Sequence, residues 1–159
     1  MFLNYIYSIL FQHIPESLAL AYTSTIFLFE KVFLKKILII GILNGIIIFF
    51  LRLMPVSFGF HTIIFLIVFF VIIKYFYKKN ILESLIAVLK SFILLAVFES
   101  IFGYLAVFIT GKSVELILSD PFLKSMIMIP QIFSLFITGL IVKNYRNKKT
   151  DNKVDKNVV

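Results

Sequence analysis

Long apolar runs separated by short polar connections dominate the chain. We place these runs at Leu3–Phe29, Ile37–Leu53, Phe58–Tyr77, Ser84–Ile109 and Phe122–Val142. Each is close to or above the roughly 20 residues that a helix needs to cross the hydrocarbon core of a bilayer. The second run is apolar at odd and even positions alike, whereas strands of a membrane barrel alternate. We therefore predict an all-α, polytopic membrane helix bundle with five transmembrane helices.

The composition agrees with a membrane protein. Of the 159 residues, 61% are hydrophobic, against about 45–50% in typical soluble domains. Two His and no Cys are too few for a structural zinc site. The chain has no glycine-rich phosphate loop, no HExxH motif and no serine nucleophile elbow. We therefore expect a multi-pass protein of the cell membrane with no enzymatic activity, no metal and no cofactor.

The basic residues predict an orientation. Twelve of the sixteen Lys and Arg residues lie in the first and third connections and in the tail, at Lys31, Lys35, Lys36, Lys74, Lys78, Lys79, Lys143, Arg146, Lys148, Lys149, Lys153 and Lys156. Because cytoplasmic loops are enriched in basic residues, the N-terminus is predicted outside and the C-terminus inside. The net charge of +8 then favours anionic lipid headgroups as partners, and no nucleic acid is expected.

This layout divides the chain into two parts. Residues 1–143 form the predicted five-helix membrane domain. Residues 144–159 form a basic cytoplasmic tail, which is polar enough that we expect it to be disordered. The outer connection Thr110–Pro121 mixes charged and apolar residues, and it is compatible with a short amphipathic helix at the interface.

Several polar residues fall inside the apolar runs. Glu16 lies at the middle of the first run, where an acidic group costs about 2–3 kcal/mol, and His13 precedes it by one turn. Glu99 lies in the outer half of the fourth run, where Arg52 or His61 is expected to reach it. We take His13, Glu16, Arg52, His61 and Glu99 as candidate ligand-binding residues.

Structural roles compete with this interpretation. Glu16 and its small polar neighbours also fit a packing stripe in which a protonated carboxyl is hydrogen-bonded. Arg52 also fits an interface anchor, and His61 a hydrogen-bonded residue at a helix start. In the second run, Gly41, Asn44 and Gly45 have the spacing of a close helix contact. We expect that contact within the chain, with a homo-oligomer face as the alternative.

One segment resembles a known family. Arg52-Leu53-Met54-Pro55 closes the second run, and Phe58-Gly59-Phe60-His61-Thr62-Ile63 opens the third. This arrangement, with Ile14-Pro15-Glu16-Ser17 upstream, resembles the N-terminal multi-helix sensor domains of Gram-positive histidine kinases of the GHKL type. The resemblance covers about residues 14–77. No phospho-acceptor helix or ATP-binding module follows the fifth run, so it implies a detached sensor-like domain without kinase activity.

Three functions remain open at this stage. The first is a sensor-like module that binds an extracellular peptide or small ligand and signals to a separate cytoplasmic protein. The second is a small-solute or proton transport component that uses the intramembrane acids. The third is a membrane scaffold or assembly subunit. The sequence does not identify the ligand, the partner or the oligomeric state.

Overall fold

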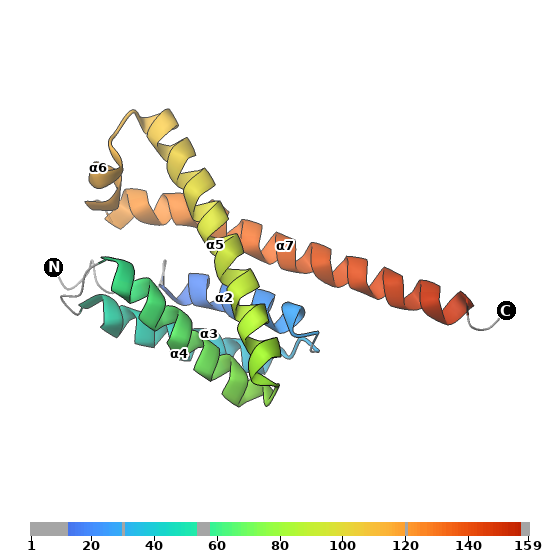
Figure 1. The fold of residues 1–159 in the computed structure, drawn as a ribbon. Helices are drawn as coiled ribbons and strands as arrows, with labels where there is room; N and C mark the ends of the chain where they lie inside the picture. Colours follow the sequence, from blue (N-terminus) through green and yellow to red (C-terminus); the bar gives the residue numbers. More distant parts are fainter. Residues whose placement is uncertain (1–12, 30, 54–57, 120, 157–159) are drawn as a thin grey trace.

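The computed structural model describes residues 13–29, 31–53, 58–119 and 121–156, and all regular structure in them is helical. The helices are α2 (Ile14–Phe27), α3 (Leu34–Leu53), α4 (Phe58–Tyr77), α5 (Ile81–Thr110), α6 (Val114–Ser119) and α7 (Pro121–Lys156). All of these except the short α6 form a five-helix bundle (Figure 1). The all-α prediction is confirmed.

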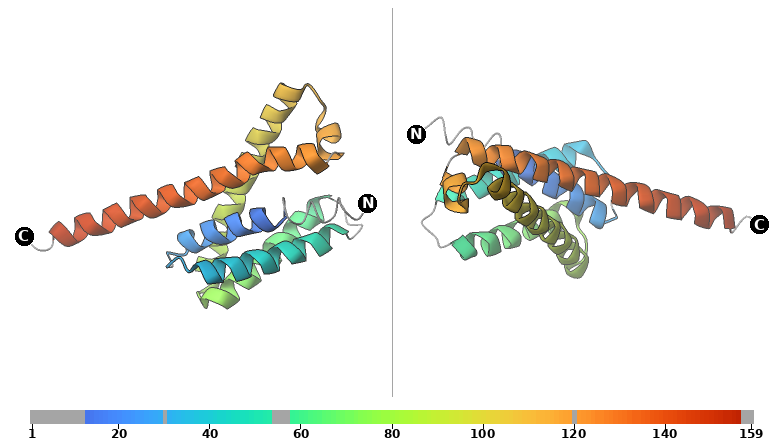
Figure 2. Two further views of the ribbon diagram at one scale, coloured as in Figure 1. Left: turned by 180° about the vertical axis from the view of Figure 1, so that it is seen from behind. Right: turned by 90° about the horizontal axis from the view of Figure 1, so that it is seen from above.

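The bundle has two ends, which are visible in Figures 1 and 2. We call one the α6 end, because α6 lies there together with the starts of α2, α4 and α7. The other, the far end, holds the last turns of α2 and α4 and the start of α5. Helix α5 crosses the other helices steeply, so its C-terminal half stands apart from α3 and α4. The C-terminal part of α7 extends past the far end.

Helix α2 is buried along almost its whole length, although many of its side chains are polar. Ser17, Thr23, Ser24 and Thr25 are fully buried, and Glu16 is 6% exposed. A buried hydroxyl costs free energy unless it is hydrogen-bonded. Thr23 donates to the carbonyl oxygens of its own helix one turn back, and the Thr25 hydroxyl makes the same kind of bond.

All four long helices around α2 also hydrogen-bond to it. The pairs are Asn44 of α3 with Ser17 (3.2 Å), Tyr77 of α4 with Thr25 (2.6 Å), Ser91 of α5 with Ser24 (2.8 Å) and Arg146 of α7 with the Ile26 carbonyl oxygen (3.0 Å). Helix α2 is therefore the polar axis of the bundle, and each of the four long helices around it contributes one of these hydrogen bonds.

Helix α3 packs on α2 through two glycines. A Cβ atom on Gly41 would lie 2.9 Å from the Cα atom of Leu18, and one on Gly45 would lie 3.1 Å from the Cα atom of Ile14. Asn44 lies between them and is fully buried. Residues 41, 44 and 45 thus lie on the face of α3 that α2 covers, and only glycine permits such a close approach of the two backbones.

The outside of the bundle is apolar. On α4, for example, Ile63, Ile67 and Val71 are more than half exposed. Helices α3, α5 and α7 contain segments long and apolar enough to cross a membrane, at Leu34–Leu51, Ile81–Thr110 and Ile127–Lys148. A polar centre with an apolar surface is the arrangement that a lipid environment favours. These features indicate a multi-pass membrane protein.

The helix bounds lie close to the predicted runs. Helix α4 has the predicted limits, and α3 and α5 each begin three residues before the predicted span. By length and composition, three of the described helices qualify as spans, while His61–Tyr77 in α4 is a shorter apolar helix. The first predicted run, Leu3–Phe29, is described only from His13 onward. The short helix expected between Thr110 and Pro121 is present as α6.

The structure differs from the prediction at the C-terminus. Helix α7 continues to Lys156, through most of the segment for which the sequence analysis expects disorder. No Gly or Pro interrupts residues 140–156, and Lys and Arg are good helix formers. Extending an existing helix also avoids the cost of nucleation, and the positive charges near its end interact favourably with the helix dipole. A polar, charged composition alone does not reveal this continuation.

The contact between α2 and α3 can be tested at Gly41. We expect Gly41→Ala to lower the stability by about 1–3 kcal/mol, because the new methyl group collides with the Leu18 backbone. Gly103→Ala in α5 is the matched control, since a Cβ atom there has no neighbour within 4 Å. Thermal unfolding in detergent, followed by circular dichroism, measures both. Equal melting temperatures for the two variants would contradict the proposed packing.

Candidate functional site

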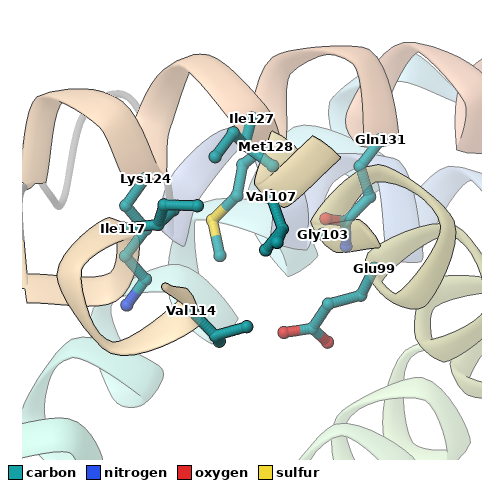
Figure 3. Close-up of a pocket in the computed structure, with 9 residues that line it drawn as sticks. All are labelled: Glu99, Gly103, Val107, Val114, Ile117, Lys124, Ile127, Met128 and Gln131. Carbon is teal, nitrogen blue, oxygen red and sulfur yellow. The ribbon is translucent and has the colours of Figure 1, made fainter. Parts of the chain in front are cut away.

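A cavity lies between α5, α6 and α7 at the α6 end of the bundle (Figure 3). The cavity volume is about 60 Å³, and the cavity is partly open to the surroundings. This volume is well below the roughly 300–1,000 Å³ of sites that enclose a whole small-molecule ligand, so the cavity accommodates only part of such a ligand. Its lining residues are Glu99, Gly103, Val107, Val114, Ile117, Lys124, Ile127, Met128 and Gln131.

Helical spacing explains how the walls form. Glu99, Gly103 and Val107 are four residues apart, so they lie on one face of α5. The α7 wall repeats the pattern with Lys124, Ile127 or Met128, and Gln131. A left-handed residue, Gly111 (φ 64°), ends α5 and lets the chain turn toward α6.

Gly103 keeps the middle of the cavity open. No heavy atom lies within 4 Å of the position that its Cβ atom would take. Any larger side chain at this position would therefore enter the empty space. Gly103 and Gly41 thus have opposite environments, because one lies beside a void and the other against the backbone of a neighbouring helix.

One end of the cavity is polar. The Gln131 amide points from α7 into the cavity on the side where Glu99 stands on α5, and the Glu99 carboxylate points along the cavity toward Val114 (Figure 3). Gln131 is only 3% exposed, yet neither its amide nor the Glu99 carboxylate is hydrogen-bonded to another residue in the described part of the chain. The Gln131 amide atoms are not fully enclosed, because they face the space of the cavity. The two groups therefore offer acceptors to a ligand.

The other end is basic, and the walls between are apolar. The Lys124 amine lies across the cavity from Glu99 (Figure 3). These two residues do not form an ion pair with each other, since no such contact involves Glu99 within the described ranges. Val107, Val114, Ile117 and Met128 supply the wall between the two charged groups. The cavity thus has the chemistry of a site for a small amphiphile.

Of the four predicted ligand-binding residues whose side chains the structure describes, Glu99 alone lines this cavity. His13 and Glu16 are 3% and 6% exposed and lie at the start of α2, inside the bundle. His61 is half-buried near the start of α4. Arg52 belongs to the last turn of α3, but its side chain lies outside the described part of the structure. The structure therefore does not gather His13, Glu16 and His61 with Glu99 at this cavity.

Sequence reasoning missed Lys124 and Gln131 as site residues. Lys124 and Gln131 lie at the two ends of an apolar stripe on α7. Glu99 likewise lies at one end of the stripe that it forms with Gly103 and Val107 on α5. This spacing was visible in the sequence, but the pairing of the two stripes was not. For metals, the described residues contain no cluster of three His, Asp or Glu side chains that could hold an ion.

A second set of contacts fixes α7 at the far end of the bundle. The Arg146 side chain donates to the Ile26 carbonyl oxygen at the end of α2, and its guanidinium group lies 5.1 Å from the centre of the Phe29 ring. A cation over an aromatic face adds to the attraction. Arg146 therefore ties the long helix that walls the cavity to the polar axis of the bundle.

Comparison with known proteins finds no similar family model, no similar curated protein and no similar solved structure. The resemblance to GHKL-type sensor domains therefore stays a prediction.

The attachment of α7 can be tested at Arg146. We expect Arg146→Gln to lower the stability by about 1–2 kcal/mol, because the Ile26 carbonyl loses a charged donor. Lys148→Gln, an exposed position on the same helix, is the control and should change stability by less than about 0.5 kcal/mol. Thermal unfolding in detergent measures the difference. If Arg146→Gln melts at the same temperature as Lys148→Gln, the contact does not hold α7.

Proposed function

We propose that the protein is an integral membrane sensor-like module with five membrane-crossing helices, an outer N-terminus and an inner C-terminus. It binds an extracellular peptide or small ligand in the cavity at the α6 end. The ligand changes the position of α7, and the far end of α7 passes this change to a separate cytoplasmic partner. The module itself performs no chemistry.

The continuity of α7 is the observation that carries this proposal. One uninterrupted helix supplies Lys124 and Gln131 to the cavity and then reaches the far end of the bundle. Gln131 and Arg146 are about 22 Å apart along the helix at 1.5 Å per residue. A rigid element shared by two sites is a physical route by which an event at one can bias the other.

The contacts of α7 with α2 begin one to two turns beyond Gln131, so a displacement of this part of α7 reaches them directly. Gly139 places the α7 backbone against the ring of Tyr22, and Phe136 stacks on the same ring at 5.3 Å between centroids. Pro130 lies inside α7, between the cavity residues Met128 and Gln131. Because proline removes a helix hydrogen bond, it provides a point at which the cavity-lining part can tilt.

The distribution of charge supports the proposed orientation. The basic residues of the α2–α3 and α4–α5 connections lie at the far end, where the Lys-rich part of α7 also emerges. At the α6 end, the described basic side chains are Lys112 and Lys124. The positive-inside rule then assigns the far end to the cytoplasm, where these residues attract anionic lipid.

This orientation predicts which introduced cysteines are accessible. The chain has no native Cys, so Tyr145→Cys on α7 and Lys112→Cys after α5 can be labelled singly. Both positions are exposed. A membrane-impermeant maleimide should modify Tyr145→Cys in inside-out vesicles and Lys112→Cys in right-side-out vesicles. Labelling of both from the same side would overturn the topology.

The coupling through α7 can be tested without knowing the ligand. Gly103→Leu places a side chain in the cavity and so imitates an occupant. We expect the distance between spin labels at Tyr75→Cys on α4 and Tyr145→Cys on α7 to shift by about 1–2 Å, a typical helix displacement in switching proteins. Electron–electron double resonance measures the distance distribution.

Gly103→Ala serves as the control for that experiment. Its methyl group enters the same space but fills little of it, so the label distance should match that of the unsubstituted protein. If Gly103→Leu also leaves the distance unchanged while the protein stays folded, the cavity is not coupled to the far end of α7, and the proposed signalling role fails.

A further inference from the structure

The polar end of the cavity specifies the chemistry of its ligand. We infer that the cavity binds an amphiphile with a single cationic group, a primary ammonium or guanidinium, on an apolar body. The cation lies between Glu99 and Gln131, and the apolar part fills the space beside Gly103. This inference rests on the proposed function in that it takes the same cavity as the ligand site.

The position of Glu99 supplies the first argument. Glu99 is about 27 Å along α5 from Ile81 and about 17 Å from Thr110 at 1.5 Å per residue. It therefore lies near the middle of a helix that is apolar enough to cross a membrane. A carboxylate at that depth is expensive and is found paired with a positive group. No basic group in the described part of the chain forms an ion pair with it.

Gln131 supplies the second argument. Its side chain is 97% buried, faces the same end of the cavity as Glu99, and makes no hydrogen bond to another described residue (Figure 3). A carboxylate and an amide oxygen together accept several hydrogen bonds. An ammonium group offers three donors and a guanidinium offers five, so either satisfies both residues at once.

Lys124 and the apolar walls determine which chemical groups the rest of the ligand can carry. A second positive group at the opposite end would meet the Lys124 ammonium and be repelled. Val107, Ile117 and Met128 form an apolar surface between the two ends, which suits a hydrocarbon chain or an aliphatic side chain. The Lys124 ammonium therefore disfavours a second cation at its own end, and the Glu99 carboxylate disfavours an anion at the other end.

The test uses n-octylammonium as the probe, with n-octanol, n-octyl sulfate and 1,8-diaminooctane as matched compounds. The purified full chain is titrated in a neutral maltoside detergent, and the melting temperature reports binding, because a ligand that binds the folded state stabilises it. We expect octylammonium to raise the melting temperature in a saturable manner, and the other three to raise it less.

An acetylated leucine-rich tripeptide amide with one lysine then distinguishes a peptide from a simple alkylamine as the source of the cation.

Substitutions locate the effect. Glu99→Gln should weaken the apparent affinity for octylammonium at least tenfold, and Gln131→Leu should weaken it by a smaller factor. Glu83→Gln is the matched control, because Glu83 is also an exposed glutamate of α5 but lies in its first turn, outside the cavity lining. It should leave the affinity unchanged. The melting temperatures without probe show that each variant is folded.

Two results would overturn the inference. One is an equal effect of octanol and octylammonium on the unsubstituted protein, which would mean that the charge is not recognised. The other is an unchanged octylammonium affinity in Glu99→Gln. Either result leaves the proposed signalling role standing if Gly103→Leu still moves α7. Specific binding of octylammonium without any movement of α7 would instead support the ligand class and contradict the signalling role.

Discussion

The polar side chains of α2 impose the constraint on which the bundle depends. In a lipid environment, a helix with Glu16, Ser17, Ser24 and Thr25 cannot face hydrocarbon without leaving these groups unsatisfied. It must be enclosed, and each neighbour then contributes a polar partner. Because every long helix hydrogen-bonds to α2, the order of packing around it follows from where those partners lie in the sequence. Individual bonds of this kind contribute little stability, so their main effect is to fix positions.

The same constraint explains why the cavity lies where it does. The polar stripe of α2 engages α5 through Ser91, in the first half of that helix. Phe92 packs nearby on Phe65 and Phe69 of α4. Beyond these contacts the steep crossing carries α5 away from α3 and α4, and its C-terminal half meets only α6 and α7 among the described helices. Only these two described helices pack against this half of α5, so it is covered less completely than the first half. Gly103 then leaves some of the space between α5, α6 and α7 empty. The site is therefore a consequence of where the packing of α5 stops.

Most of the fold was predictable, and most of the site was not. Apolar length alone placed the limits of α4 correctly and those of α3 and α5 within three residues, because span length depends on local composition. The continuation of α7 was missed, since charged residues are compatible with both disorder and helix. For the site, the sequence identified Glu99 as a candidate binding residue, but its predicted partner was Arg52 or His61. Periodicity shows which residues share a face of one helix, but the partner face depends on the crossing angle of α5 with α7, which no local pattern contains.

The division of the molecule into a closely packed half and an open half bears on the proposed response to a ligand. Around α2, glycine contacts and hydrogen bonds join the helices, so a displacement there disrupts several contacts at once. Around the cavity, α7 is held by apolar contacts next to Pro130, and the space beside Gly103 is unfilled. An occupant therefore meets its least resistance by tilting the first part of α7. Gln131 follows Pro130, so a ligand held by Gln131 acts directly on the part of α7 that carries Gly139 and Arg146. A ligand can shift this equilibrium only by its difference in affinity for the two positions of α7. Glu99 and Gln131 are suited to create such a difference, because they lie on different helices and one cation can hydrogen-bond to both only when the two helices are the right distance apart.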